Sequence, residues 1–148
     1  RALDLGCGSA VLALAMHKSW RRTVLASDID GVALGVARDN LRANGVAHTA
    51  SHRRAGVALR QATGLADRLL LAARPYPLIV ANILAGPLIG LSRAIARAGA
   101  RPGRIVLSGL LDTQEASVLA AYRRQGLHLE KRIRIGAWPT LILKGGGR

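Results

Sequence analysis

The chain has 148 residues, a length that fits one domain with a hydrophobic core of ordinary size. Because 50% of its residues are hydrophobic and 20% are charged, a disordered polar chain is excluded. The 22 basic side chains outnumber the 8 acidic ones, and the formal charge of +14 allows RNA or the ribosome as a neighbour. Of the basic residues 19 are Arg and are scattered, so compositional bias is an open alternative to a binding patch.

The cysteine content and the longest uncharged stretch indicate the compartment. Lone Cys7 excludes a disulfide framework and a multi-cysteine zinc site, and we expect a reducing, cytoplasmic location without a membrane span. Residues 75–92 carry no charge, but Pro77, Asn82 and Pro87 interrupt them, which predicts a buried strand and a helix. The first residues already have the pattern of a buried strand, so we expect an N-terminally truncated chain.

In chain order, the first half predicts two strand–helix units. An apolar run at Ala2–Leu5 ends in a glycine turn, and apolar residues then recur at helical spacing over 11–19. A second strand is predicted at 23–27, followed by a helix that Asp30 caps and that ends at Asn44-Gly45. Its apolar face is predicted to contain Val32, Ala33, Val36, Ala37 and Leu41.

Alternating strands and helices continue to the end of the chain. Asp112 and Glu115 resemble a capping box that opens a helix reaching residue 125. The other predicted elements are a strand at 56–62, a helix at 65–73, a strand at 78–81, a helix at 86–98 with Leu88, Leu91 and Ile95 inward, a strand at 104–108 after a turn at 101–103, and a hairpin of 127–135 with 138–143.

This order predicts an α/β fold. Crossover helices imply a doubly wound, mostly parallel sheet, and the closing hairpin adds antiparallel strands at its C-terminal side. We expect one Rossmann-like domain at 1–144 and a flexible glycine-rich tail at 145–148.

The turn after the first strand predicts a cofactor site. Gly6 and Gly8 have no Cβ, so the backbone turns tightly and approaches a bound molecule, toward which the amides of the following helix point. Asp28 ends the next strand, where a carboxylate accepts hydrogen bonds from both hydroxyl groups of an adenosine ribose. The two features together predict an adenosyl cofactor.

Two positions favour S-adenosylmethionine over a dinucleotide. Val11 stands where the dinucleotide fingerprint needs Gly or Ala, so a pyrophosphate fits less well. Asp4 suits a cofactor with a positively charged amino group, which it meets directly or through water. The structural alternatives are that Asp4 only braces the loop amides, and that Asp28, like Asp30, only caps.

Four segments resemble the ribosomal protein L-eleven methyltransferase family, over almost the whole chain. They are Asp-Leu-Gly-Cys-Gly-Ser at 4–9, Ala-Ser-Asp-Ile-Asp at 26–30, Val-Ala-Asn-Ile-Leu-Ala-Gly-Pro-Leu at 80–88 and Leu-Ser-Gly-Leu-Leu at 107–111. The third and fourth segments are the more specific. The resemblance is to the family's C-terminal catalytic domain, and it implies methyl transfer from S-adenosylmethionine to lysine and N-terminal amines of a large-subunit ribosomal protein.

The resemblance also implies roles for residues. The side chain of Asn82 and the backbone at Ile83 are implied to accept hydrogen bonds from the N–H groups of the acceptor amine. Asn82 is also implied to contact the cofactor. The alternative is that Asn82 is only a turn residue at a strand end. Thr63 stands where such enzymes commonly have an Asp toward the adenine amino group. The implied cofactor-binding set is Asp4, Gly6, Gly8, Asp28, Thr63 and Asn82.

The chain also departs from the family's pattern. Ala10 replaces the usual third glycine, and we expect its methyl group to be tolerated. Pro77 stands where an acidic residue usually precedes the fourth strand. The family's N-terminal domain, through which the ribosomal protein is bound, and its glycine- and histidine-containing loop before the first strand have no counterpart in these residues. We therefore expect weak cofactor binding at most.

Two other functions stay open. An RNA or small-molecule N-methyltransferase is compatible with Asn82, although the usual Asn-Pro-Pro pattern is absent. A catalytically incompetent, basic binding module is compatible with Thr63 and Pro77. His48 and His52 have i,i+4 spacing but neither a helical pattern nor a third ligand, so we expect no metal site.

Overall fold

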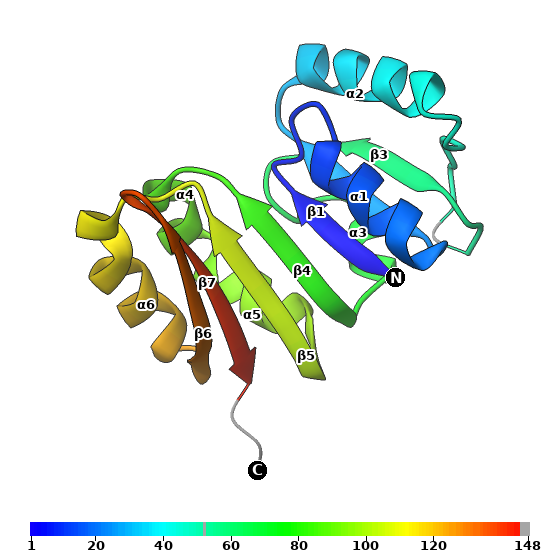
Figure 1. The fold of residues 1–148 in the computed structure, drawn as a ribbon. Coiled ribbons are helices and arrows are strands. Elements are labelled where there is room, and N and C mark those ends of the chain that lie inside the picture. The colour runs from blue at the N-terminus through cyan, green and yellow to red at the C-terminus, as the bar shows by residue number, and fades with distance from the viewer. Residues whose placement is uncertain (52, 146–148) are drawn as a thin grey trace. The chain divides into compact units, whose positions relative to one another are not determined.

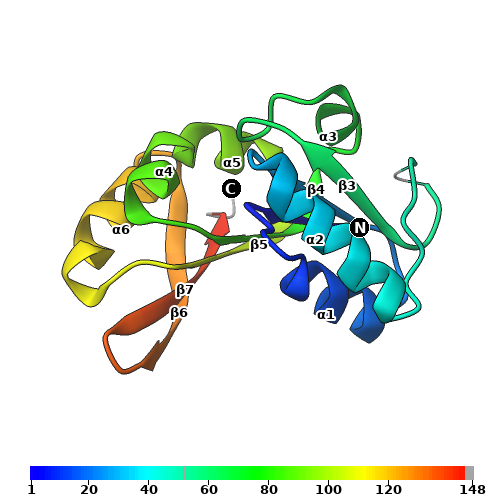
Figure 2. The ribbon, with the colours of Figure 1, turned by 90° about the horizontal axis from the view of Figure 1, so that it is seen from above.

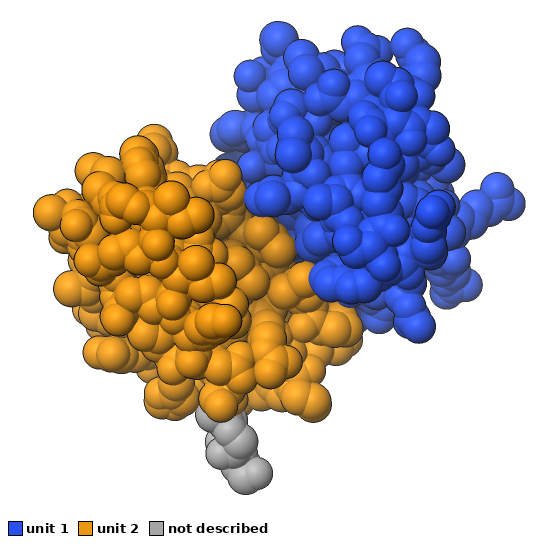
Figure 3. Space-filling model, in the orientation of Figure 1, with its two compact units in different colours: residues 1–74 blue, residues 75–148 orange. Residues whose placement is uncertain are grey.

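The computed structural model describes residues 1–51 and 53–145 (Figure 1). The chain divides into two compact units, Arg1–Arg74 and Pro75–Arg148 (Figure 3). His52 and residues 146–148 of the predicted tail lie outside the described residues. Among the described residues, no helix combines the length and the apolar character that a membrane crossing needs.

The first unit is built on three parallel strands, as the alternating pattern predicts. They are adjacent in the order β3-β2-β1, and β1 and the first four residues of β2 are buried, as expected for parallel strands. In this unit α1 and α2 contact each other (Figure 2). The elements are β1 (Ala2–Leu5), α1 (Val11–Trp20), β2 (Val24–Asp28), α2 (Gly31–Ala43), β3 (Val57–Gln61) and α3 (Arg68–Ala72).

Helix α2 begins and ends where the sequence predicts, but its buried face differs. Asp30 Oδ1 accepts the Val32 N–H at 2.8 Å, and Gly45 just past the C-terminus has φ +64°. The predicted face was wrong at Val32, which is 78% exposed, and at Val36, which is 48% exposed. The helix buries Leu34, Ala37 and Leu41. Apolar residues at 32–34 and 36–37 form two overlapping stripes on the helix. The stripe that contains Leu34, which is larger than valine, is the one that is buried.

The second unit is a mixed sheet in the order β4-β5-β7-β6, with β4 and β5 parallel. Strand β7 pairs antiparallel with both β5 and β6, so the predicted C-terminal hairpin is confirmed. The strand predicted at 78–81 is longer, and a register shift between Tyr76 and Leu78 accommodates Pro77, which has no N–H for the ladder. The strands are β4 (Tyr76–Asn82), β5 (Gly99–Ser108), β6 (Leu127–Ile135) and β7 (Trp138–Gly145).

The predicted helix at 86–98 is two helices that meet at Leu91, which is half-buried, directly after the weak helix former Gly90. As predicted, Leu88 and Ile95 are fully buried. Near the hairpin, α6 lies alongside β6 in both views (Figures 1 and 2). The helices of this unit are α4 (Ala85–Gly90), α5 (Ser92–Ala98), the 3₁₀ turn η1 (Asp112–Gln114) and α6 (Glu115–Arg123).

The capping box predicted from Asp112 and Glu115 was wrong. Gln114 instead accepts the Leu111 N–H through its side-chain oxygen at 2.9 Å. Glu115 is buried, because its carboxylate accepts hydrogen bonds from Arg132 at 2.8 Å and from Arg134 at 3.3 Å. Tertiary pairing between α6 and β6 therefore determines the role of this carboxylate.

Candidate functional site

The glycine turn after β1 is attached to the end of β2. The amides of Gly6 and Cys7 donate to the Ser27 carbonyl at 2.7 and 2.9 Å. Gly6 and Gly8 have φ values of +72° and +51°, which favour glycine. A Cβ built on Gly8 would meet nothing within 4 Å, so there is open space next to this backbone.

Asp28 contacts the glycine turn directly. Its Oδ2 accepts the Gly8 N–H at 2.8 Å, and its Oδ1 accepts the Asp30 N–H at 3.0 Å. Asp28 therefore also has the structural role that the sequence left open. Because each carboxylate oxygen has a second lone pair, Asp28 keeps capacity for further donors.

Asp4 is a buried carboxylate with one unsatisfied oxygen. Its Oδ2 accepts the Ala13 N–H of α1 at 2.9 Å, whereas its Oδ1 has no hydrogen-bond partner among the described residues. Burial raises the pKa of Asp4 to about 6. The hydrogen bond from Ala13 lowers this pKa, and the charge of Asp28 raises it by a smaller amount. Asp4 thus braces the loop, and its second oxygen favours a ligand that donates a hydrogen bond or carries positive charge.

Two neighbours of the turn have structural roles. Burial raises the pKa of the Cys7 thiol to about 12, and Asp4 and Asp28 add to the shift, so the thiol stays protonated and unreactive. Ala10 is buried at the start of α1 with φ +64°. Its methyl group fits, but the left-handed conformation costs an alanine about 1 kcal/mol.

Residues after β2 and β3 extend the same edge of the first unit. The Ala62 N–H donates to the Asp28 carbonyl at 2.9 Å, which places exposed Thr63 one residue from this contact. Sequence reasoning missed Ile29, which is 66% exposed although apolar; an isoleucine between two aspartates at a strand end was the available signal. It also missed Asn40 of α2, whose side chain donates a hydrogen bond to the Ser9 carbonyl at 2.9 Å. No pattern in the sequence marks Asn40 as part of this site.

Asn82 and Ile83 lie at the carboxyl end of β4 in the second unit. Asn82 is exposed, and its carboxamide has no hydrogen-bond partner among the described residues. The Ile83 carbonyl lies one residue before Leu84, the N-cap of α4, so it is outside the hydrogen bonds of the helix, whose first acceptor is the Leu84 carbonyl. Within the described part of the chain this carbonyl accepts no backbone hydrogen bond, so two acceptor groups are available at adjacent residues.

Other candidate sites are weaker. The described residues contain no group of three His, Cys, Asp or Glu side chains able to hold a metal ion, and the backbone of His48 forms an isolated β-bridge with Val57.

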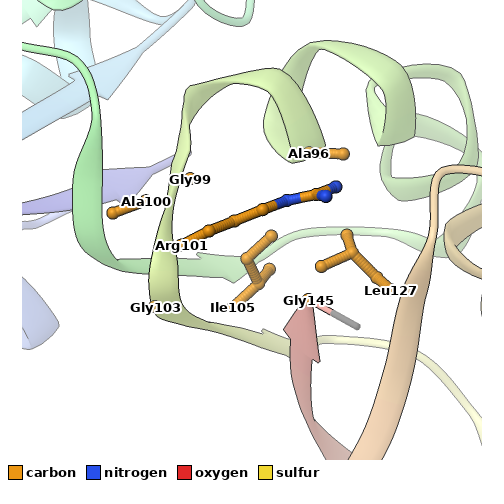
Figure 4. Close-up of a pocket in the computed structure, with 8 residues that line it drawn as sticks. All are labelled: Ala96, Gly99, Ala100, Arg101, Gly103, Ile105, Leu127 and Gly145. Carbon is orange, nitrogen blue, oxygen red and sulfur yellow. The ribbon is translucent and has the colours of Figure 1, made fainter. Parts of the chain in front are cut away.

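In the second unit the Arg101 side chain extends across a cavity of about 10 Å³ next to Ile105 and Leu127 (Figure 4), which is too small for a cofactor. A concave surface of about 300 Å³ in the first unit is lined by Arg38, Leu41, Arg42, Val46 and His48.

Comparison with known proteins gives the family. Residues 1–145 match the family described as Ribosomal protein L11 methyltransferase (PrmA). A protein of that name from Bradyrhizobium diazoefficiens is 44% identical over 145 residues, which are 98% of this chain and 47% of that protein. One from Brucella suis is 43% identical over 143 residues, 97% of this chain and 48% of the relative. The chain therefore spans about half the length of the curated relatives it matches.

Solved structures agree with this result. The ribosomal protein L11 methylase of Lactobacillus delbrueckii subsp. bulgaricus is 29% identical, with a TM-score of 0.85 over 98% of this chain and 70% of that chain. For the fold alone, the precorrin-6y C5,15-methyltransferase of Geobacter metallireducens, 19% identical, superposes with a TM-score of 0.75 over 99% of this chain and 79% of that one. The predicted Rossmann-like α/β fold is thereby confirmed. The match over residues 1–145 also confirms the resemblance found in the sequence, and the chain belongs to the ribosomal protein L11 methyltransferase family.

Proposed function

We propose that this chain binds S-adenosylmethionine and transfers its methyl group to lysine and N-terminal amines of ribosomal protein L11, in the cytoplasm. The observation that carries the proposal is the hydrogen bond from Gly8 to Asp28, with the unsatisfied oxygen of Asp4 in the same unit. The names of the relatives support the choice of substrate.

The first unit offers groups that suit each part of the cofactor. Asp28 is suited to accept the ribose hydroxyl groups, and the open space at Gly8 admits a ligand close to the backbone. The unsatisfied Oδ1 of Asp4 is suited to the cofactor's ammonium group. Exposed Ile29 and Thr63 offer an apolar surface and a hydroxyl to the base.

The second unit offers groups that suit the acceptor. When bound, the cofactor would supply a methyl group on a sulfonium, to which the amine nitrogen would bond while the carbon–sulfur bond breaks and the neutral thioether leaves, so no nucleophilic side chain is needed. Asn82 Oδ1 and the Ile83 carbonyl accept the two N–H bonds of a neutral primary amine, which orients its lone pair. The proton that the methylated amine then carries passes to solvent, because Asn82 is exposed.

Methyl transfer tests this function. Asn82→Ala is expected to reduce labelled methyl transfer to purified ribosomal protein L11 by about 100-fold, since it removes one of two orienting acceptors. The control Asn44→Ala makes the same chemical change at the end of α2 and is expected to retain transfer. Absence of transfer by the unmodified chain, or equal losses in both variants, would contradict the function.

We further propose that a basic surface of the first unit binds RNA phosphates, as an enzyme acting near the ribosome would. The concave surface carries Arg38, Arg42 and His48 over an apolar floor. Desolvation lowers the pKa of His48, and the charges of Arg38 and Arg60 lower it further, so the imidazole stays neutral and the positive charge of this surface comes from the arginines. Asp39 pairs with Arg42 at 3.2 Å, but both side chains are exposed and such a pair is weak, so Arg42 is available to a phosphate.

Substitution of this surface distinguishes RNA binding from compositional bias. The double variant Arg38→Ser/Arg42→Ser is expected to weaken binding of a short RNA about 10-fold at low salt and to reduce the slope of log K against log salt by about 1 to 2. Its matched control is Arg93→Ser/Arg97→Ser, exposed arginines with the same spacing on α5. If the two double variants lose affinity equally, the effect is net charge and the surface is not a site.

A further inference from the structure

Gly109 lies against both acceptor groups of the second unit. It directly follows β5 and has φ +80°. A Cβ placed on Gly109 would lie 2.8 Å from Asn82 Oδ1, 2.8 Å from the Ile83 carbonyl oxygen and 2.9 Å from the Ile83 nitrogen. The two oxygens are therefore both close to one point, and they converge where the β5 backbone passes the end of β4.

We propose that Gly109 is a positioning residue for the acceptor amine, a role that rests on the proposed function. Carbon contacts below 3.0 Å are not tolerated, so any side chain at this position must displace the Asn82-Ile83 turn. Two of the three atoms belong to the Ile83 backbone, which has no rotamer by which to move away. A shift of the reacting geometry by about 1 Å reduces rates by about 100-fold.

The contacts around the turn explain why the oxygens stay fixed and free. Ser108 pairs with Asn82 across the two strands, and its hydroxyl hydrogen-bonds the Thr140 hydroxyl at 3.2 Å, which fixes the end of β5 immediately before Gly109. The Ile83 carbonyl takes no part in the hydrogen bonds of α4, because Leu84 is the N-cap and its carbonyl accepts the Leu88 N–H at 3.1 Å. Gly109 thus lies against both oxygens, and no backbone donor among the described residues occupies the Ile83 carbonyl.

Positive φ is not the reason that this position needs glycine for function. Gly126 has a similar φ of +76°, but a Cβ there would meet only a terminal guanidinium nitrogen of Arg101, at 3.8 Å, an ordinary contact distance. Gly126→Ala therefore has the same backbone penalty as Gly109→Ala without the close approach. The difference between the two variants isolates the contact with Asn82 and Ile83.

The test compares these two variants in the 148-residue chain. Gly109→Ala is expected to reduce kcat for methyl transfer by about 100-fold, with the affinity for S-adenosylmethionine by calorimetry changed by less than about 3-fold. Gly126→Ala is expected to reduce kcat by less than about 3-fold. Equal losses of kcat in the two variants would overturn the proposal.

A measurement without cofactor or substrate separates this proposal from the proposed function. The side-chain amide signals of Asn82 in a ¹⁵N correlation spectrum are expected to shift in Gly109→Ala and not in Gly126→Ala, even if the chain transfers no methyl group. If Gly109→Ala lowers the melting temperature of the unmodified chain, it is expected to lower that of the Asn82→Ala variant by less, because one of the close contacts is absent there. Unshifted Asn82 signals, or equal losses in both backgrounds, would show that Gly109 does not act on this turn.

Discussion

Asp28→Ala is expected to lower the affinity of the chain for S-adenosylmethionine by at least about 100-fold, because on the proposed function it removes a charged group that accepts two hydrogen bonds from the ribose. The substitution also frees the Gly8 and Asp30 amides, which Asp28 holds at 2.8 and 3.0 Å. We therefore expect the glycine turn to be less well ordered. Isothermal titration at one pH measures the loss.

Asp30→Ala is the matched control for this experiment. Asp30 lies two residues away and accepts the Val32 N–H at 2.8 Å, so its loss removes a helix cap and costs about 1 kcal/mol of stability. We expect its cofactor affinity to change by less than about 2-fold, because a cap contributes to folding and not to binding. If both variants bind the cofactor as the unmodified chain does, Asp28 is only a structural group.

Asp4→Asn is expected to stabilise the protein while weakening cofactor binding. The amide oxygen of Asn keeps the Ala13 hydrogen bond, and removal of a buried charge raises the free energy of unfolding by about 2 kcal/mol near pH 7.5. On the proposed function Asp4 faces the cofactor's ammonium group, so loss of its charge is expected to lower affinity by roughly 10-fold to 100-fold. Urea unfolding and calorimetry on the same samples measure the two effects.

The stability difference depends on pH in a direction that follows from the pKa of Asp4. Burial raises that pKa from 3.8 to about 6 in the folded protein, so the folded state binds more protons than the unfolded state between these values. The stabilising contribution of protonated Asp4 is complete below about pH 4 and is lost as the pH rises through about 6. The advantage of Asp4→Asn is therefore expected at pH 7.5 and absent near pH 4. An equal advantage at both pH values would contradict a buried, titrating Asp4.

Local signals in the sequence were sufficient for most elements. Asp30 and Gly45 mark the ends of α2 because capping and positive φ depend on the residues themselves. The proximity of Gly8 and Asp28 could be predicted for a related reason, since the carboxyl ends of adjacent parallel strands meet at one edge of the sheet. Both features follow from rules that need no knowledge of packing.

Features that depend on tertiary partners could not be predicted from the sequence. Glu115 has the spacing of a capping residue, yet Arg132 and Arg134 from a distant strand bury it. The buried face of α2 was ambiguous because Val32 and Leu34 are similarly apolar, and only packing distinguishes them. Gly109 lies in a segment that carries the family resemblance, but the sequence does not show why glycine is needed there, because the close approach to Asn82 exists only in the folded chain.

An NMR titration of the 148-residue chain with S-adenosylmethionine tests the cofactor site most directly. The backbone amides of Gly8 and Asp30, which donate to Asp28, and of Ala13, which donates to Asp4, are expected to shift and saturate together, while those of Gly126 and Gly136 stay unchanged. If saturating cofactor leaves the three amides unmoved, or shifts a different set, the glycine turn and Asp28 do not form the binding site.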